Sequence, residues 1–489
     1  MSFKTLLFCL LLFDGTRALF RDSDAGWHIR TGEAILNGSG LPHSDAYSLL
    51  RAGQPWFAWE WAADLAMGAL HAWGGLAAVA VAYAIVLAAC TWVWFRLHWA
   101  VGGHFLLAGV MAVFMLSTVN MHWHARPHVV GWLMLMLGVW WAETAGSRMS
   151  ASQALATGLF GALWANVHAS FFLGTVIAVL YAAGHALRPL IWTADQRDEW
   201  ARARAFAIAA AVFSLGTLLN PYGWRLHQHV ISYLSNGELL SRVGEFQSFN
   251  FHTGGSAMVL ATVACAAAGG VLALSQGRLP WFLISAVLLV AGLRSARGLP
   301  IVALVVLPIA NGAITRALGC GAGLRPRFRH ALDGFLNYGR NLRRLDRRYS
   351  GLALAAPIAA AALALSQLAA VQAYSGFPPE EFPVRAADRV AMLPARARIL
   401  APDKYGGYLI YRFNGTRRVY FDGRSDFYGA RYMNDYLRII EVRAGWRENV
   451  ERFGFTHALL PNRYSLVPAL TAAGWKTLYR DEVATLLEK

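Results

Sequence analysis

RDSDAGWHIRTGE, residues 21–33, follows directly on an apolar run at residues 3–20. Its aspartates, histidine and arginines would stand where an apolar helix leaves a bilayer. We expect ten further apolar runs, and nearly every acidic, His or Asn-Pro cluster between them falls on the same side of the membrane as residues 21–33. Because these clusters share one side, we expect the scattered polar residues to form one candidate site. The apolar runs predict a polytopic α-helical membrane protein.

The composition favours a membrane protein. Of the 489 residues, 56% are hydrophobic and 15% are charged, whereas soluble domains carry roughly 25% charged residues. A helix that crosses a bilayer needs about 20 apolar residues, and shorter runs are tolerated inside a bundle. We therefore predict about 11 transmembrane helices, near residues 3–20, 75–95, 104–121, 129–145, 152–165, 170–187, 205–219, 255–275, 279–293, 299–317 and 351–372.

Basic residues set the expected orientation, because cytoplasmic loops retain Lys and Arg. With Lys4 inside, the arginine-rich segment 318–350 is also cytoplasmic and the C-terminal part lies outside. We expect the first run to remain as a span rather than to be cleaved as a leader. The net charge of +16 fits anionic lipid headgroups better than nucleic acid, because the basic residues lie beside the spans.

The chain divides into two predicted parts. Residues 1–373 form the transmembrane part, with a first outer loop at 21–60 and a basic cytoplasmic linker at 318–350 that is flexible or lies on the membrane. Residues 374–489 form a small α/β domain outside the membrane, with a mainly parallel sheet. Its expected strands are 398–401, 418–421, 457–460, 476–479 and 483–487, and its helices are near 405–412, 431–453 and 464–473.

The first outer loop is long enough to fold. We expect one interfacial helix at about 26–36, ended by Gly38 and Gly40, and a second from about Trp56 onward. Glu60 lies in this second helix, which carries its acidic side chains on one face.

Asp22 and Asp24 are the first candidates for chemistry. An Asp-x-Asp pair can hold a divalent cation such as Mg²⁺ or Mn²⁺, or supply a general base. His28 lies one helical turn after Asp24, and Arg30 follows His28 by two residues in the same segment. The alternative interpretation is a helix cap with solvated charges, although capping does not exclude catalysis.

A second cluster holds His122, His124, Arg126 and His128. Histidines at this density can be metal ligands, or they can hydrogen-bond headgroups at a membrane boundary. Arg126 is a candidate phosphate contact, because a guanidinium matches phosphate geometry with two parallel hydrogen bonds.

Two further outer loops carry candidate substrate-binding residues. Asn166 and His168 lie between two short spans, where polar groups usually face protein or a water-filled cavity. Asn220 and Tyr222 belong to an Asn-Pro-Tyr-Gly run, which also forms a turn by its own chemistry. Turns and helix caps are the alternatives for both pairs.

The remaining candidates come late in the chain. Glu245 is a lone outer acid and a candidate partner for Asp24. Arg294 and Arg297 oppose the positive-inside tendency, which suggests an anionic phosphate or, alternatively, solvation at headgroup level. Residues 420–426 follow a predicted strand, and we expect a structural role because no glycine-rich phosphate loop accompanies them. We expect the outer residues, Asn166 and Arg294 included, to share one cleft with Asp24.

At these residues the chain resembles the GT-C superfamily of membrane glycosyltransferases. The resemblance covers the plan of essentially the whole chain, and it is closest to bacterial members with a first loop like residues 22–33. Such members share a Glu-Trp pair like Glu60-Trp61, an Asn-x-His like residues 166–168 and an Asn-Pro-Tyr-Gly loop like residues 220–223. The motifs are specific as a set and weak singly.

The resemblance implies a catalytic role for a first-loop aspartate, as base or metal ligand, and this role falls on Asp24 or Asp22. The adjacent acid pair of the mannosyltransferase branch is absent, which leaves open which aspartate acts. The Trp-Trp-Asp motif of oligosaccharyltransferases is also absent, which disfavours peptide N-glycosylation. A place in the bacterial inner membrane follows from the same resemblance.

An outward-facing site has no access to nucleotide sugars, so a donor there must be carried by lipid. The expected reaction is inverting transfer of a hexose or pentose from polyprenyl phosphate to an acceptor hydroxyl on a cell-envelope glycan, lipid or protein. A divalent cation is compatible with this reaction and not required. The alternative is a non-catalytic transporter, flippase-like or assembly protein that binds lipid-linked saccharide.

Overall fold

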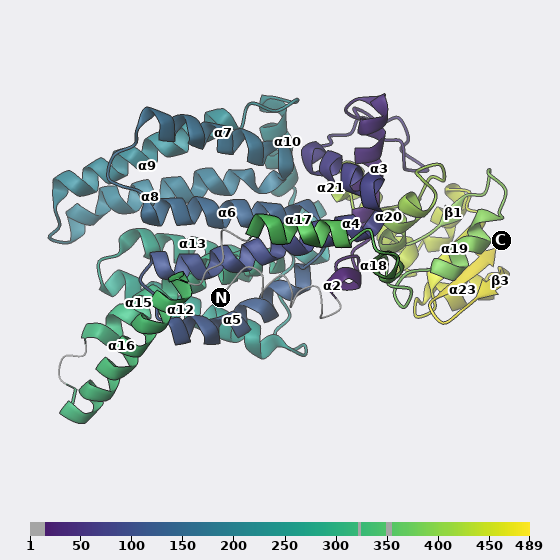
Figure 1. Cartoon of the computed structure of the whole chain (residues 1–489). Coiled ribbons are helices and arrows are strands. Elements are labelled where there is room, and N and C mark those ends of the chain that lie inside the picture. Colours follow the sequence, from purple (N-terminus) through teal and green to yellow (C-terminus); the bar gives the residue numbers. More distant parts are fainter. Residues whose placement is uncertain (1–14, 321–323, 349–354) are drawn as a thin grey trace.

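The computed structural model describes residues 15–320, 324–348 and 355–489. Long helices lie side by side as a bundle, with the strands and the C-terminus at one end and α16 (Pro326–Arg348) at the other (Figure 1). The bundle contains α4 (Trp61–Ala100), α5 (Phe105–Val119), α6 (Pro127–Thr144), α7 (Ala151–Val167), α8 (Phe172–Ile191), α9 (Gln196–Gly216), α12 (Ser256–Ser275), α13 (Leu279–Arg294), α14 (Leu299–Ile301), η6 (Val302–Val306), α15 (Leu307–Cys320) and α17 (Ala355–Leu365).

Within the described ranges, five helices are long and apolar enough to cross a membrane: Trp61–Ala100, Phe105–His122, Ala169–Ile191, Ser256–Ser275 and Ala296–Cys320. Each predicted run after the first overlaps a helix, and the first run lies largely outside the described residues. The predicted number of about 11 spans is not confirmed, because several of the other helices are shorter than a bilayer-crossing helix. The chain is thus a mostly helical protein with several apolar helices of membrane-crossing length.

Two helices of the first outer loop differ from their predicted bounds. The first is α3 (Asp24–Ala34), which continues as η1 (Ile35–Ser39) and ends where Gly38 and Gly40 adopt φ of 86° and 69°. The second begins at Trp61 instead of Trp56. The amide of Trp56 donates to the carbonyl of His43 at 3.0 Å, and the amide of Ala58 donates to the Tyr222 hydroxyl at 3.0 Å. These long-range bonds hold the preceding segment out of the helix.

The second interfacial helix and the next predicted span form one continuous helix in the structure, and a kink divides them. The long helix α4 contains non-helical backbone at Gly74 (φ −151°) and Gly75 (φ 60°). A left-handed φ is accessible to glycine at little cost. The amphipathic first section therefore changes direction before the apolar section begins.

The basic segment 318–350 is helical over most of its described residues, which favours the membrane-lying alternative of the prediction over a flexible linker. Helix α16 packs back onto the bundle, where the Phe335 ring stacks on His104 with centroids 4.0 Å apart. At its C-terminal end, Asp346 accepts a hydrogen bond from Trp99 Nε1 at 2.9 Å. These contacts fix the helix against α4 and α5.

A small sheet lies near the C-terminus, with strand order β1-β2-β4-β3. The strands are β1 (Ile399–Leu400), β2 (His457–Pro461), β3 (Lys476–Arg480) and β4 (Ala484–Glu488). Only β1 and β2 pair in parallel, whereas β4 pairs antiparallel with both β2 and β3. The predicted mainly parallel sheet is therefore wrong, because the closing hairpin folds β4 between its neighbours. The helices of this part are α18 (Ala369–Tyr374), α19 (Val384–Ala391), α20 (Asp403–Arg412), α21 (Ser425–Ile440), α22 (Trp446–Arg452) and α23 (Leu466–Ala472).

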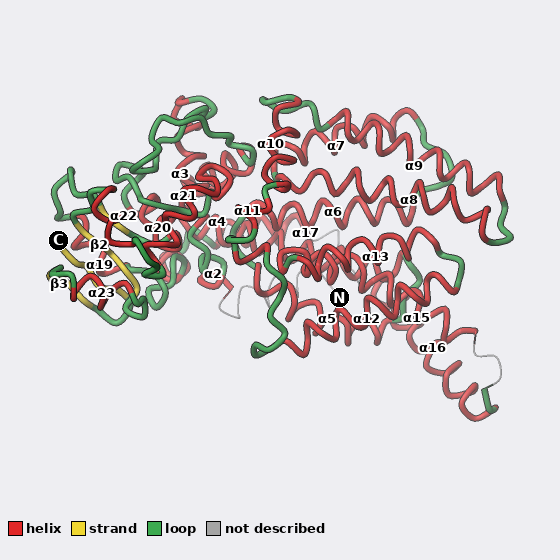
Figure 2. Tube along the Cα trace, turned by 180° about the vertical axis from the view of Figure 1, so that it is seen from behind, coloured by secondary structure: helices red, strands yellow, loops and turns green. Residues whose placement is uncertain are grey.

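The predicted strand at 418–421 is also wrong. Val419 pairs instead with the first outer loop: its amide donates to the Tyr47 carbonyl at 2.9 Å, and its carbonyl accepts from the Leu49 amide at 2.7 Å. Helix α20 packs on α3 so closely that a Cβ on Gly26 would lie 2.1 Å from the Gly407 carbonyl oxygen. Residues distant in sequence thus form one layer beside the end of the bundle, where Figure 2 shows most of the long loops. The division of the chain at residues 373 and 374 stays a prediction.

Candidate active site

A cavity of about 720 Å³ lies where this layer meets the bundle end. Every segment that the sequence places on the outer side contributes to its wall. The lining residues fall within 21–27, 56–60, 122–135, 168–173, 230–246 and 291–301, and the late segments 403–404 and 421–437 complete it. The loops that we expect on one side of the membrane therefore line one common cavity.

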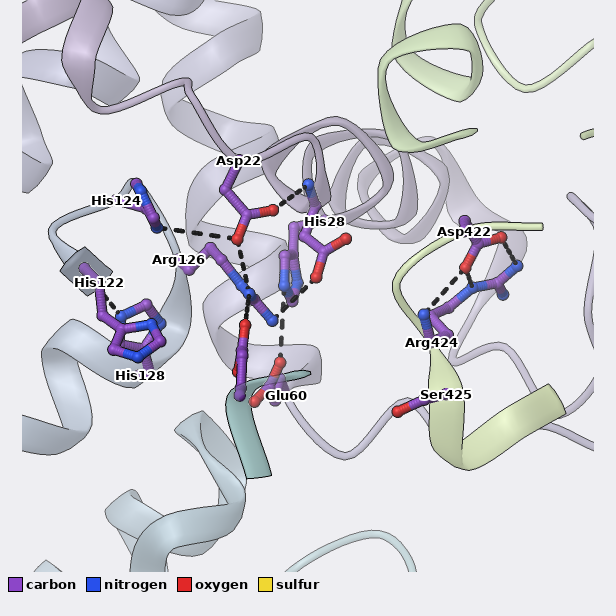
Figure 3. Close-up of polar contacts among 12 residues, drawn as sticks. Asp22, His28, Glu60, His122, His124, Arg126, His128, Asp422, Arg424 and Ser425 are labelled. Atoms are coloured by element: carbon purple, nitrogen blue, oxygen red, sulfur yellow. Dashed lines mark hydrogen bonds and ion pairs between the residues drawn. The ribbon is translucent and has the colours of Figure 1, made fainter. Parts of the chain in front are cut away.

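Arg126 lies at the centre of the acidic groups in this cavity. Its guanidinium contacts Asp22 Oδ2 at 2.7 Å and Asp24 Oδ2 at 2.8 Å, and Glu245 Oε1 lies 3.6 Å away. Figure 3 shows the guanidinium directed at the Asp22 carboxylate. The backbone of Arg126 is extended, with φ −137° and ψ 152°, as expected before Pro127. The proline that starts α6 thus helps to aim the arginine at the first loop.

The two first-loop aspartates have opposite electrostatic settings. Burial would raise the pKa of Asp22, but the charges of Arg126 and His124 and the Asp24 amide, which donates to Asp22 Oδ1 at 2.9 Å, lower it overall. Burial raises the pKa of Asp24 to about 8 and outweighs the attraction of Arg126, while the neighbouring carboxylates raise it further. When the environment drives the pKa values of two neighbouring carboxyl groups apart, one group stays ionised and the other can act as an acid or base. Asp22 stays ionised and holds Arg126, whereas Asp24 can gain and lose a proton near neutral pH.

A second chain of titratable groups runs inward from the cavity wall. His28 Nδ1 lies 2.5 Å from Asp64 Oδ1, and His28 Nε2 lies 3.6 Å from Glu60 Oε2. Glu60 also faces His168 Nε2 at 3.2 Å. Burial raises the pKa of Glu60 to about 7, and burial holds the pKa of His28 well below its usual range. Glu60 is therefore a second acid that can exchange a proton at the cavity, with a neutral imidazole behind it.

The Arg126 guanidinium bridges the carboxylates of Asp22 and Asp24, which are the residues predicted to hold a possible divalent cation. In the described part of the chain, no group of three or more His, Cys, Asp and Glu side chains is arranged to hold a metal. The histidines of the second outer loop do not converge: His128 Nε2 bonds to the His122 carbonyl at 2.8 Å, and His124 Nδ1 lies 3.7 Å from Asp22 Oδ2. Arg126 supplies the positive charge that a cation would otherwise bring.

The structure brings together only part of the set predicted from sequence. Those at the cavity are Asp22, Asp24, Glu60, His122, His124, Arg126, His128, His168, Glu245 and Arg297, with His28 directly behind Glu60. Arg297 Nη1 contacts Glu245 Oε2 at 3.0 Å. Glu245 therefore lies between two arginines, and burial, which would raise its pKa, is outweighed by their charges, which lower it.

The other predicted substrate-binding residues do not line the cavity. Arg30 donates to the Tyr411 carbonyl at 2.8 Å and pairs with Glu33. Asn166 accepts from Trp61 Nε1 at 2.7 Å. Arg294 ends α13 with its side chain exposed. The expectation that Asn166 and Arg294 share a cleft with Asp24 is therefore not met, because local partners and helix direction turn both away.

Asn220 and Tyr222 also serve the loop itself. Asn220 Oδ1 accepts from the Tyr222 amide at 2.8 Å, which forms the turn that was the alternative interpretation. The Tyr222 hydroxyl accepts from the Ala58 amide, as described above. Their contacts support a structural role in positioning the segment that leads to Glu60.

Sequence reasoning missed the contribution of residues 421–426, which line the cavity opposite Arg126. Arg424 forms buried ion pairs with Asp422 and with Asp45 of the first loop, each at 2.7 Å. Figure 3 shows Asp422 and Arg424 paired at the start of α21. A Cβ on Gly423 would lie 2.0 Å from Asp24 Oδ1. The Asp-Gly-Arg turn was visible in the sequence, but its approach to Asp24 depends on long-range packing.

Comparison with known proteins gives a match among solved structures. No family model matches the sequence, and no curated protein matches it. Among solved structures, the chain is similar to the crystal structure of the Archaeoglobus fulgidus oligosaccharyltransferase in its apo form, with a TM-score of 0.55 and 12% sequence identity. The match covers 94% of this chain and 69% of that one.

At this identity the likeness concerns the fold. The chain shares the overall fold of that solved structure, and it has a polar cavity at one end of its helices. The resemblance inferred from sequence is thereby supported at the level of the fold.

Proposed function

We propose that this protein is a membrane glycosyltransferase that moves a sugar from a polyprenyl-phosphate donor to an acceptor hydroxyl on a cell-envelope glycan, lipid or protein. The observation that carries this proposal is the buried Asp24, held beside Arg126 in a cavity at the end of a GT-C-type bundle. A carboxyl with a raised pKa next to a fixed positive charge is suited to proton removal coupled to departure of an anion.

The position of the cavity supports a lipid-carried donor. It opens where apolar helices end, so a prenyl chain can remain among them while the phosphate reaches Arg126 and Arg297. Aromatic side chains, Trp27, Trp56 and Trp59 among them, form part of the wall. Apolar surface with a few convergent polar groups is typical of small-molecule sites. We place the cavity on the extracytoplasmic side of a bacterial inner membrane, where activated sugars are carried by lipid.

The proposed step is a single displacement. The acceptor oxygen bonds to the anomeric carbon as the bond from that carbon to the phosphate oxygen breaks, which inverts the anomeric centre. Asp24 takes the proton of the acceptor hydroxyl. The polyprenyl phosphate leaves with the electron pair, and Arg126 and Arg297 stabilise its negative charge. Asp22 and Glu245 remain ionised and keep both arginines in place.

The rate of transfer is expected to rise with pH through about 8. Asp24 acts as a base only when deprotonated, and its pKa is raised to about 8, so each pH unit below that value costs about tenfold in the fraction of active enzyme. Initial rates with purified protein and a panel of lipid-linked sugars, measured between about pH 6 and pH 9, test this. A rate that falls as pH rises through this range contradicts the role of Asp24 as base.

Removal of divalent cations is expected to leave transfer within about twofold of its original rate, because Arg126 already lies where an ion would bridge Asp22 and Asp24. The measurement is the rate after treatment with a chelator, with and without added Mg²⁺ or Mn²⁺. A loss that only the added ion restores would contradict this expectation and assign a metal to the aspartates.

The proposed function itself is tested in a deletion strain. Wild-type protein should restore a sugar that is missing from a surface glycan, and the Asp24→Asn variant should not, although it reaches the membrane in equal amount. A transporter or assembly protein would also be needed for that sugar, but it has no need of a base at residue 24. Full restoration by Asp24→Asn would therefore favour the non-catalytic alternative.

A further inference from the structure

Helix α16 lies at the end of the bundle remote from the cavity and projects beyond the neighbouring helices (Figure 1). Its rotation about its own axis is fixed by contacts on one side. His104 Nε2 bonds to the Phe335 carbonyl at 2.9 Å, and a Cβ on Gly339 would lie 2.0 Å from that nitrogen. The bond from Trp99 to Asp346 holds the C-terminal end. The other faces of the helix are thus presented in a defined direction.

One of these faces is a stripe of arginines. Their spacing of i, i+3, i+4, i+7 and i+8 places them along a single side of the helix. The stripe, called here the arginine stripe, comprises Arg340, Arg343, Arg344, Arg347 and Arg348.

Among the residues that the structure describes, the arginine stripe lacks counter-charges. No ion pair joins any of its members to a carboxylate elsewhere in the described chain, and Arg340 only bonds to the neutral Asn337. The nearby acid, Asp346, is buried and directed at Trp99 and Arg96. Burial, with repulsion from its three neighbours in the stripe, lowers the pKa of Arg343. Like charges at helical spacing destabilise a helix, so this arrangement favours an external anion.

An apolar face lies on nearly the opposite side of the helix from the stripe, because successive residues turn by about 100°. Ala331, Tyr338 and Leu345 are seven residues apart and therefore lie on the same side of the helix. Tyr338 is 57% exposed and Leu345 is 51% exposed. A helix with arginines on one face and exposed apolar and aromatic side chains on the other has the properties of a helix that lies in a membrane interface.

We propose that α16 docks on the headgroup layer of the leaflet opposite the cavity, where the arginine stripe binds the phosphates of anionic phospholipids. Tyr338 and Leu345 insert beside the acyl chains, and the apolar ends of α5 and α15 bring the bilayer to this helix. Segment 324–348 carries eight arginines and two aspartates, which complements an anionic surface. The apolar face distinguishes this surface from one that binds nucleic acid. The inference does not depend on the proposed transfer activity.

The test is native mass spectrometry of the full-length protein in detergent with phosphatidylglycerol or phosphatidylcholine. Wild type should retain phosphatidylglycerol preferentially. The double variant Arg344→Gln with Arg348→Gln should retain it about fivefold less per arginine removed at low ionic strength, given the usual contribution of an arginine at an anionic surface. A matched control removes two exposed arginines of the C-terminal part, Arg385→Gln with Arg418→Gln, and should retain phosphatidylglycerol like wild type.

Two outcomes overturn the proposal. One is equal retention of phosphatidylglycerol by the stripe variant and the control. The other comes from wild type alone, so it does not depend on how a variant folds: a preference for phosphatidylglycerol that is unchanged between about 0.05 and 0.5 M salt. Screening over this range should weaken contacts between exposed arginines and headgroups.

Discussion

Replacement of Asp24 by asparagine is expected to lower the rate of sugar transfer by about 10³-fold, because a positioned general base contributes roughly 10²–10⁴-fold. Asparagine keeps the shape of the side chain and a hydrogen-bonding oxygen for Arg126. It cannot accept the proton of the acceptor hydroxyl at any pH. The measurement is transfer from lipid-linked sugar by the purified variant, which should also lose the rise in rate through about pH 8.

Loss of activity in Asp24→Asn is not expected to reflect unfolding. A carboxyl whose pKa is raised on folding favours the folded state at low pH, and this contribution is lost as pH rises through about 8. A neutral residue at this position should therefore be as stable as wild type, or more stable, above that pH. The matched control is Asp388→Asn, an exposed acid that pairs with Arg412 far from the cavity wall. Retained transfer in Asp24→Asn would show that Asp24 is not the base, and Glu60 would then be the candidate for that role.

Replacement of Arg424 by methionine is expected to lower the free energy of unfolding by about 3–5 kcal/mol, the usual cost of breaking a buried ion pair by removing one partner. Arg424 is 2% exposed and is paired with Asp422 and Asp45, which are both buried. Methionine fills similar volume but leaves two carboxylates without a counter-charge. The shift of the urea-unfolding midpoint in detergent micelles measures the effect.

A triple variant separates the charge effect from packing. If unpaired carboxylates cause the loss, then Asp45→Asn and Asp422→Asn added to Arg424→Met should recover much of the stability. Arg447→Met, an exposed arginine beside Trp446, serves as the single-site control and should change the midpoint little. Equal stability of Arg424→Met and the control would mean that this ion-pair cluster does not hold the first loop to the C-terminal part.

Local patterns predicted the helices well, because apolar periodicity and glycine act over a few residues. The end of η1 at Gly38 and Gly40 and the strands β2, β3 and β4 follow from such signals. Strand pairing is a different matter. Residues 418–421 look like a strand, yet Val419 pairs with Tyr47 and Leu49 of the first loop, and no local pattern specifies a partner so distant in sequence.

The site shows the same limit at the scale of single residues. Arg294 is the last residue of α13 and Arg297 lies three residues later in η5 (Ala296–Gly298), and of the two only Arg297 reaches the cavity, where it contacts Glu245. The turn η5 between α13 and α14 decides which side chain points inward. Similarly, the Asn166 side chain accepts a hydrogen bond from Trp61, and this contact depends on the packing of α7 against α4.

The amino-acid order by itself determined that the chain is a helical membrane-type protein with acidic, histidine and arginine clusters between its apolar runs, because hydropathy and spacing act locally. Tertiary structure alone decided that Arg126 bridges Asp22 and Asp24, that Gly423 borders the Asp24 carboxylate, and that α16 turns its arginines outward. Charge pairing, burial and the resulting pKa shifts depend on distances between groups that the chain separates by many residues, and only packing sets those distances.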